Sequence, residues 1–80
     1  MNTYTAVKNR ILHLLGERKM SIHKLATLSA VAPSSIKNIL YGKSQNPGIV
    51  TIKLLCDGFE ISLTDFFDTK EFRELEQEIK

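Results

Sequence analysis

Residues 25–43, "LATLSAVAPSSIKNILYGK", decide the fold of this protein. The stretch begins with the apolar spacing of an amphipathic helix, breaks at Pro33 and resumes with two serines where a surface helix would carry charged side chains. Proline is disfavoured inside a helix but favoured at its first position, so the stretch predicts a helix over 22–29 and a second helix starting at Pro33. Ser21 is suited to cap the first helix, and Gly42 is the expected left-handed stop of the second.

Amphipathic patterns on both sides of this stretch predict three more helices. Apolar residues recur three and four positions apart over 5–18, with Thr3 or Thr5 as the N-cap, and a further apolar pattern covers 49–59. The letters "SLTD" at 62–65 match a capping box at the start of another helix. No alternating strand pattern occurs, so the expected fold class is all-α, with a five-helix domain over residues 1–69.

Residues 70–80 form an acidic tail in which Phe72, Leu75 and Ile79 lie three and four positions apart. This spacing predicts a short helical tail with one narrow apolar stripe. Two interpretations of the stripe stay open at this point. It packs against the 5–18 helix of the same chain, or it contacts a second copy.

Length and composition limit the class of protein. Eighty residues allow one compact domain with one modest core. The single cysteine, Cys56, excludes an intramolecular disulfide, and the longest stretch without charge, residues 25–36, is shorter than the ~20 residues of a membrane span. The N-terminus lacks the continuous apolar run of a signal peptide, so the expected location is the cytoplasm.

Charge is divided unequally along the chain. Residues 1–53 hold eight Lys and Arg residues and one Glu, a net charge of +7, whereas residues 54–80 carry −5. A polyanion is therefore expected to bind the first two thirds of the chain and to avoid the last third. No metal-ligand spacing links His13, His23 and Cys56, and no glycine-rich phosphate loop occurs, so neither an enzyme nor a bound metal or cofactor is expected.

Two short helices joined by the tight "SAVA" turn, with Val31 between them, match the helix-turn-helix unit. The sequence "MSIHKLATLSAVAPSSIKNILYGK", followed by "NPGIVTIKLLCDGFEISLTDFF", resembles the Cro/C1-type helix-turn-helix family, also called the lambda-repressor-like or XRE family. The resemblance covers residues 7–68 and implies a protein that binds double-stranded DNA. The matching positions are Leu25, Ala26, Val31, Ser34, Ser35, Ile36, Ile39, Gly42, Lys43, Pro47, Thr51, Ile61, Ser62 and Leu63.

Ser34, Lys37 and Asn38 fall at i, i+3 and i+4, so they share one face of their helix. Short side chains allow close approach to base edges, where asparagine can pair with adenine and lysine can donate to guanine. The resemblance implies that this face reads bases and that flanking residues contact phosphates. The implied base-reading residues are Pro33, Ser34, Lys37 and Asn38, and the implied phosphate-contacting residues are Ile22, His23, Lys24, Ser35, Tyr41, Lys43, Ser44, Gln45 and Asn46.

The chain departs from the family pattern in three places. Ile22 stands where the family commonly has glutamine, so a phosphate contact there has to come from a backbone amide or from His23. Ala32 lacks the hydroxyl that usually caps the next helix, a change that typically costs ~1 kcal/mol. The glutamines common at positions 33 and 34 are missing, so the operator sequence cannot be carried over from a relative.

The function that the resemblance implies is a small transcriptional regulator, most simply a repressor that occupies its operator. Such a protein gains affinity and specificity as a homodimer on two half-sites ~34 Å apart. The candidate dimer interface consists of Phe66, Phe67, Phe72, Leu75 and Ile79. The alternative is a protein-interaction regulator, such as an antitoxin, whose acidic tail binds a toxin or another regulator and whose DNA binding is secondary.

Overall fold

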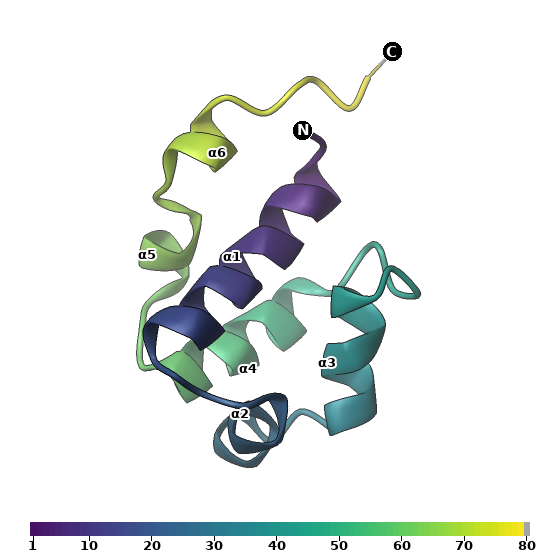
Figure 1. Cartoon of the computed structure of the whole chain (residues 1–80). Coiled ribbons are helices and arrows are strands. Elements are labelled where there is room, and N and C mark those ends of the chain that lie inside the picture. Colours follow the sequence, from purple (N-terminus) through teal and green to yellow (C-terminus); the bar gives the residue numbers. More distant parts are fainter. Residues whose placement is uncertain (80) are drawn as a thin grey trace.

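The computed structural model describes residues 1–79, which form six helices and contain no strand. Figure 1 shows α1 running diagonally across the molecule, with α2 at the bottom, α3 on the right, and α5 and α6 on the left. This all-helical arrangement confirms the predicted all-α fold class. The helices are α1 (Thr3–Glu17), α2 (Ile22–Ser29), α3 (Pro33–Leu40), α4 (Ile49–Phe59), α5 (Leu63–Phe67) and α6 (Lys70–Arg73).

The α2–α3 pair forms as its sequence predicts. The Ser21 hydroxyl accepts a hydrogen bond from the Lys24 amide at 3.0 Å, which caps α2. α2 ends at Ala30, which lies in the left-handed region with φ 60°, and α3 begins at Pro33 without a side-chain cap. Val31 is buried in the angle between the two helices. The turn therefore holds α3 at a defined angle to α2, as a helix-turn-helix requires.

One hydrophobic core unites α1 to α5. Each of these helices contributes apolar side chains to the core, and the fully buried ones include Ile11, Leu25, Ile36, Leu55 and Phe66. Burial of this apolar surface is the main favourable contribution to folding. The core lies behind α3, so the inward face of that helix is held rigidly while its outward face stays open.

Two details of the helices differ from the sequence prediction, one at the N-cap of α1 and one on the surface of α4. α1 begins at Thr3, and its N-cap is Asn2, whose side chain accepts from the Thr5 amide at 2.8 Å, so both predicted threonine caps are wrong. Asparagine is a stronger N-cap than threonine, which explains the shift. In α4 the apolar residues Ile49 and Leu54 are exposed, because the core meets only the face that carries Ile52, Leu55 and Phe59.

The helical prediction for the tail is correct for one turn only. α6 covers Lys70–Arg73, capped by the Thr69 hydroxyl, and residues 75–77 and 79 have no regular structure. Four negative side chains from Glu71 to Glu78 repel one another along a helix, and only Phe72 finds apolar partners, the rings of Phe66 and Phe67. Lys80 lies outside the described residues.

Phe66 was wrongly included in the predicted dimer interface. Its side chain is fully buried, with the Arg10 guanidinium lying over its ring. Phe72 packs on the core beside the rings of Phe66 and Phe67, whereas Ile79 is 87% exposed. In residues 1–79 no helix is long and apolar enough to cross a membrane.

Candidate nucleic-acid interface

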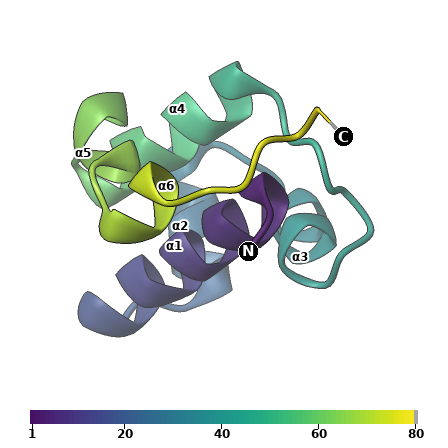
Figure 2. The same cartoon turned by 90° about the horizontal axis from the view of Figure 1, so that it is seen from above.

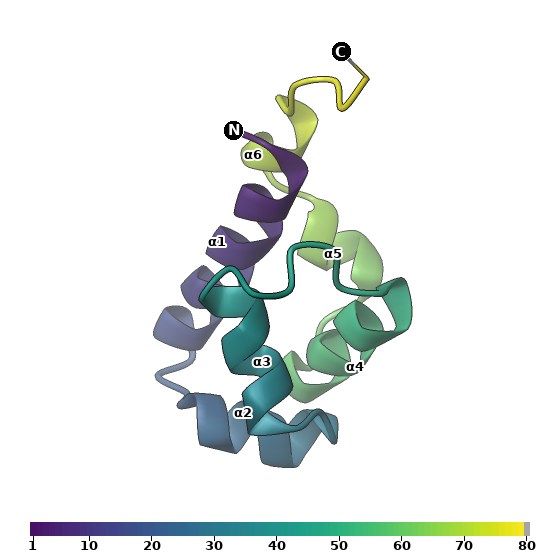
Figure 3. The same ribbon diagram turned by 90° about the vertical axis from the view of Figure 1, so that its right-hand side faces the viewer.

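The outward face of α3 is free of contacts with the rest of the fold (Figure 3). Ile36, Ile39 and Leu40 point into the core and are at most 8% exposed, so the opposite face has to meet solvent. The predicted base-reading residues all lie on this open face and are exposed: Pro33, Ser34, Lys37 and Asn38. The exposed face of α3 therefore carries short polar side chains and one lysine on a helix whose opposite face is held in the core.

The loop after α3 folds back on the end of the helix. Gly42 has φ 87°, a left-handed conformation that glycine adopts without strain, and it ends α3 as predicted. The Ser44 amide then donates to the backbone oxygen of Asn38 at 2.8 Å, and the Gln45 side chain donates to the Gly42 oxygen at 3.0 Å. These bonds position the exposed side chains of Tyr41, Lys43, Gln45 and Asn46 beside the outward face of α3.

The start of α2 offers a second group of exposed polar residues. His23 and Lys24 are exposed, and they lie at the positive end of the helix dipole. Ile22 is half-buried with its side chain packed against the core, so only its backbone remains for an outside contact. The sequence prediction that this end depends on an amide or on His23 agrees with this geometry.

A shallow hollow of about 220 Å³ separates the end of α3 from the start of α4. α4 begins after Gly48 without a side-chain cap, so its first amides lack that intramolecular acceptor. A hollow of hydroxyl and amide groups at the positive end of a helix favours an anion. Its polar lining consists of Ser35, Asn38, Ser44, Asn46 and Thr51.

Thr51 was not among the predicted site residues. The sequence feature that could have indicated Thr51 is its position in the first turn of the predicted 49–59 helix. That helix begins directly after the Pro47-Gly48 pair. Folding brings this turn next to Ser35 and Asn38, which are more than ten residues away in the sequence.

The open face carries positive charge that no carboxylate neutralises. Among the ion pairs within residues 1–79, none involves Lys24, Lys37 or Lys43. The acidic residues that do form pairs lie elsewhere, for example Asp57 with Lys53 on α4 and Glu17 at the end of α1. The positive charge of these lysines therefore attracts a polyanion to this face.

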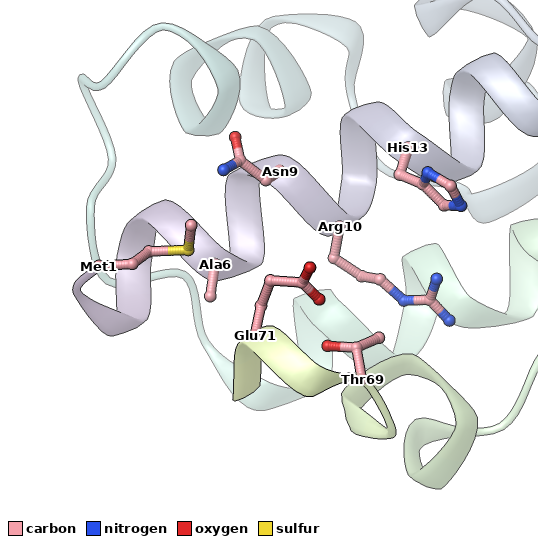
Figure 4. A pocket seen from close by; sticks show the side chains of 7 residues that line it. All are labelled: Met1, Ala6, Asn9, Arg10, His13, Thr69 and Glu71. Carbon is pink, nitrogen blue, oxygen red and sulfur yellow. The ribbon is translucent and has the colours of Figure 1, made fainter. Parts of the chain in front are cut away.

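A second pocket, between α1 and α6, lies apart from this face (Figure 4). It has a volume of about 350 Å³, and Arg10 and Glu71 point into it. The Arg10 guanidinium is committed to structure, because it donates to the backbone oxygens of Phe66 at 2.8 Å and Asp65 at 3.0 Å. His13, at the edge of the pocket, lies 3.3 Å from the Glu17 carboxylate.

The other side chains that could act as nucleophiles or metal ligands are not grouped into a site within the described residues. Cys56 is completely buried, and burial raises the pKa of its thiol. Within the part of the chain that the structure describes, no three His, Cys, Asp or Glu side chains are grouped to hold a metal ion.

Comparison with known proteins agrees with this geometry. The family model for the Cro/C1-type helix-turn-helix DNA-binding domain matches residues 10–71. A solved structure titled "Crystal structure of the prophage Lp1 protein 11" is similar to this chain, with 30% sequence identity and a TM-score of 0.79. The similarity covers 94% of this chain and 100% of that one. No curated protein matches the sequence.

Proposed function

The chain belongs to the Cro/C1-type helix-turn-helix DNA-binding family, and from that premise we propose that it is a sequence-specific repressor that reads the DNA major groove with α3. Membership in the family makes it a DNA-binding protein of transcription regulation. The observation that carries the finer proposal is the open, positively charged outward face of α3, on which all four predicted base-reading side chains are exposed.

Base recognition in this proposal depends on Asn38 and Lys37. The major groove of B-DNA admits an α-helix, and there asparagine pairs bidentately with adenine while lysine donates to guanine. Ser34, in the first turn of α3, is short enough to let the helix approach closely and can donate or accept a hydrogen bond. Pro33 presents its ring beside these groups and suits an apolar contact such as a thymine methyl.

Phosphate contacts on both sides of α3 would hold the helix in register. On one side lie His23, Lys24 and the first amides of α2, at the positive end of its dipole. On the other side lies the hollow at the start of α4, where Ser35, Ser44 and Thr51 surround a space suited to a phosphate oxygen. Lys43 and Tyr41 extend this second anchor along the backbone of the duplex.

A homodimer on two half-sites is part of the proposal. The molecule measures 38 × 24 × 21 Å, so two copies with their α3 helices ~34 Å apart would lie side by side on one face of the duplex. Among the predicted interface residues Ile79 is exposed, while Phe67, Phe72 and Leu75 are half-buried. Exposed apolar side chains at the start of α4, Ile49 and Val50, supply further surface near the DNA.

Binding to random and selected duplexes at several salt concentrations tests the proposal. When a protein neutralises Z phosphates, the logarithm of its binding affinity falls with the logarithm of salt concentration at a slope near −0.9Z. The purified protein should therefore bind random duplex at low salt, and its affinity should fall steeply as the salt concentration rises. Selection from a random duplex pool should then yield a preferred sequence with two related half-sites. Absence of salt-sensitive binding would overturn the proposal and favour the protein-interaction alternative.

Two substitutions separate base reading from phosphate anchoring. Asn38→Ala should cost about 1–3 kcal/mol of binding free energy on the preferred site and little on random duplex, because it removes a base contact. Lys43→Ala should weaken binding to every duplex alike and reduce the salt slope by about 1. Fluorescence anisotropy titrations on both duplexes measure the difference. Equal losses on every sequence for Asn38→Ala would remove it from the base-reading residues.

A further inference from the structure

The part of the acidic tail that follows α6, residues 74–79, lies across the N-terminal end of α1. Figure 2 shows the yellow segment leaving α6 and passing over the start of α1, on the side where the loop between α3 and α4 lies. Figure 1 places both chain ends at the same end of the molecule. The segment follows this path without helical structure over residues 75–77.

Two carboxylates of the tail bind residues at the N-terminal end of the chain. Glu78 accepts two hydrogen bonds from Thr3, one from the hydroxyl at 2.8 Å and one from the backbone amide at 3.3 Å. Thr3 is the first residue of α1, so Glu78 satisfies an amide at the positive end of the helix dipole. Glu76 lies 3.5 Å from the amino group of Met1. Glu76 is therefore paired with a cationic group, and Glu78 is held by two hydrogen-bond donors at the start of a helix.

The fastened tail brings negative charge to the edge of the proposed DNA interface. Glu78 lines a hollow of about 540 Å³ together with Gln45 and Asn46, two of the predicted phosphate-contacting residues. Tyr4 from α1 lines the same hollow and donates from its hydroxyl to the backbone oxygen of Ile39 at the end of α3. The start of α1, the tail and the loop after α3 thus form one continuous surface.

We propose that the acidic tail is an autoinhibitory strap that lowers the affinity of this protein for DNA while Glu76 is paired with the amino group of Met1 and Glu78 with Thr3. This inference depends on the proposed function, because it concerns the phosphate anchor beside α3. Negative charges within the ~10 Å screening length of a bound phosphate repel it, and the strap holds the Glu78 carboxylate on the surface that it shares with Gln45 and Asn46. Released, the same carboxylates spread through solvent and act less on that phosphate.

The strap is built to open readily. The Glu76 side chain is 65% exposed in its pair with the amino terminus, and exposed ion pairs are weak and screened by salt. DNA or a basic surface can therefore displace the tail at small cost. A modest bias of this kind changes affinity by a fewfold and acts equally on all DNA sequences, because it opposes phosphates and not bases.

The test compares the double variant Glu76→Gln/Glu78→Gln with the unchanged protein. The variant keeps the size of both side chains and removes the charges, so it should bind random and preferred duplexes about fivefold more tightly at 50 mM salt, an advantage that shrinks at higher salt. Glu71→Gln/Glu74→Gln is the matched control. It changes the net charge equally, yet within the described structure neither residue forms a hydrogen bond or ion pair with Met1 or Thr3, so its gain should be clearly smaller.

Thr3→Val separates release of the strap from added positive charge. It removes the hydroxyl that donates the shorter of the two hydrogen bonds to Glu78, keeps the backbone amide and leaves the net charge unchanged, so tighter DNA binding by this variant cannot come from added positive charge. Circular dichroism checks that each variant is folded, and the amide shifts of Thr3 and Tyr4 in NMR spectra report release of the tail without DNA.

Three results would overturn the strap. One is unchanged or weaker binding by Glu76→Gln/Glu78→Gln when the unchanged protein binds DNA, and another is an equal gain in the Glu71→Gln/Glu74→Gln control. In both of these results the proposed function survives. Failure of the unchanged protein to bind any duplex would instead remove the proposed function, and the strap with it.

Discussion

At the scale of single residues, side-chain size and polarity assign each position of α3 to the core or to solvent. Isoleucine and leucine at 36, 39 and 40 are buried, and the short polar residues between them are exposed. A helix with 3.6 residues per turn allows no other division of this sequence, so the exposed face could be predicted from spacing alone. Thr51 could not, because its proximity to Ser35 depends on how the chain turns after Gly42.

Cys56 illustrates a residue whose chemistry is suppressed by its position. Burial raises the pKa of its thiol, with a further raising effect of Asp57, against the lowering effects of Lys53 and Arg10. Above the ordinary thiol pKa of about 8.5 the unfolded chain loses this proton before the folded chain does, so the free energy of unfolding should fall as pH rises from 8 to 10. Below that pH the thiol is protonated in both states, and this contribution is constant.

Urea unfolding at several pH values measures this effect, with Cys56→Ala as the control. The control lacks the thiol, so its stability should change less between pH 8 and pH 10. A thiol reagent should also modify the native protein at least ~100-fold more slowly than the protein in denaturant, since the reacting thiolate is inaccessible when folded. Rapid modification of the native protein would contradict the buried position.

At the scale of elements, the junctions between helices show where local signals suffice. Ser21, Ser62 and Thr69 each accept a hydrogen bond from the amide three residues ahead, so a hydroxyl at the cap position marks a helix start in the sequence itself. α3 starts without such a cap and depends on Pro33, whose backbone angle is already helical. α6 stops after one turn because its acidic residues repel and the core offers room for Phe72 alone.

The crossing of α2 and α4 requires a glycine. A Cβ atom on Gly58 would lie 3.1 Å from both Leu25 Cδ1 and Ser29 Cβ, and 3.3 Å from the Ser29 backbone nitrogen. Alanine favours a helix over glycine by about 1 kcal/mol, but forcing these helices apart costs about 1–3 kcal/mol. Gly58→Ala should therefore lower the free energy of unfolding by up to about 2 kcal/mol in urea titrations.

Gly16→Ala is the matched control for this substitution. Gly16 also lies in a helix, and a Cβ atom there would meet nothing within 4 Å. The control should gain up to ~1 kcal/mol from helix propensity. A stability gain of similar size in Gly58→Ala would show that the two helices do not pack this closely.

At the scale of the whole molecule, the division of charge along the sequence becomes a division in space. Lys24, Lys37 and Lys43 gather on the face that carries α3, whereas α5 and α6 carry acidic side chains elsewhere on the molecule. Such a dipolar molecule is oriented as it approaches a polyanion, which raises the rate of productive encounter. The tail is the exception, because it returns acidic charge to the edge of the basic face.

Arg10 joins parts of the chain that are far apart in the sequence. Its guanidinium donates to the backbone oxygens of Phe66 and Asp65 at the end of α5 and stacks over the Phe66 ring. Arg10→Lys should lower the free energy of unfolding by about 1–2 kcal/mol, because an ammonium group cannot reproduce this fork of donors. Arg73→Lys, at an exposed pair with Asp68, should change it by less than ~0.5 kcal/mol. Equal effects in denaturant titrations would contradict the role of Arg10.

The sequence by itself determined α2 to α5, the caps at Ser21 and Ser62 and the outward face of α3, because each depends on neighbours within four residues along the chain. Only the tertiary structure decided which apolar residues the core would use. Ile49 and Leu54 were left in solvent and Phe66 was buried under Arg10, since the core accepts one face of each helix and the packing selects it. The return of Glu78 to Thr3 was likewise invisible in the sequence, because it joins residues 75 positions apart through the shape of the whole molecule.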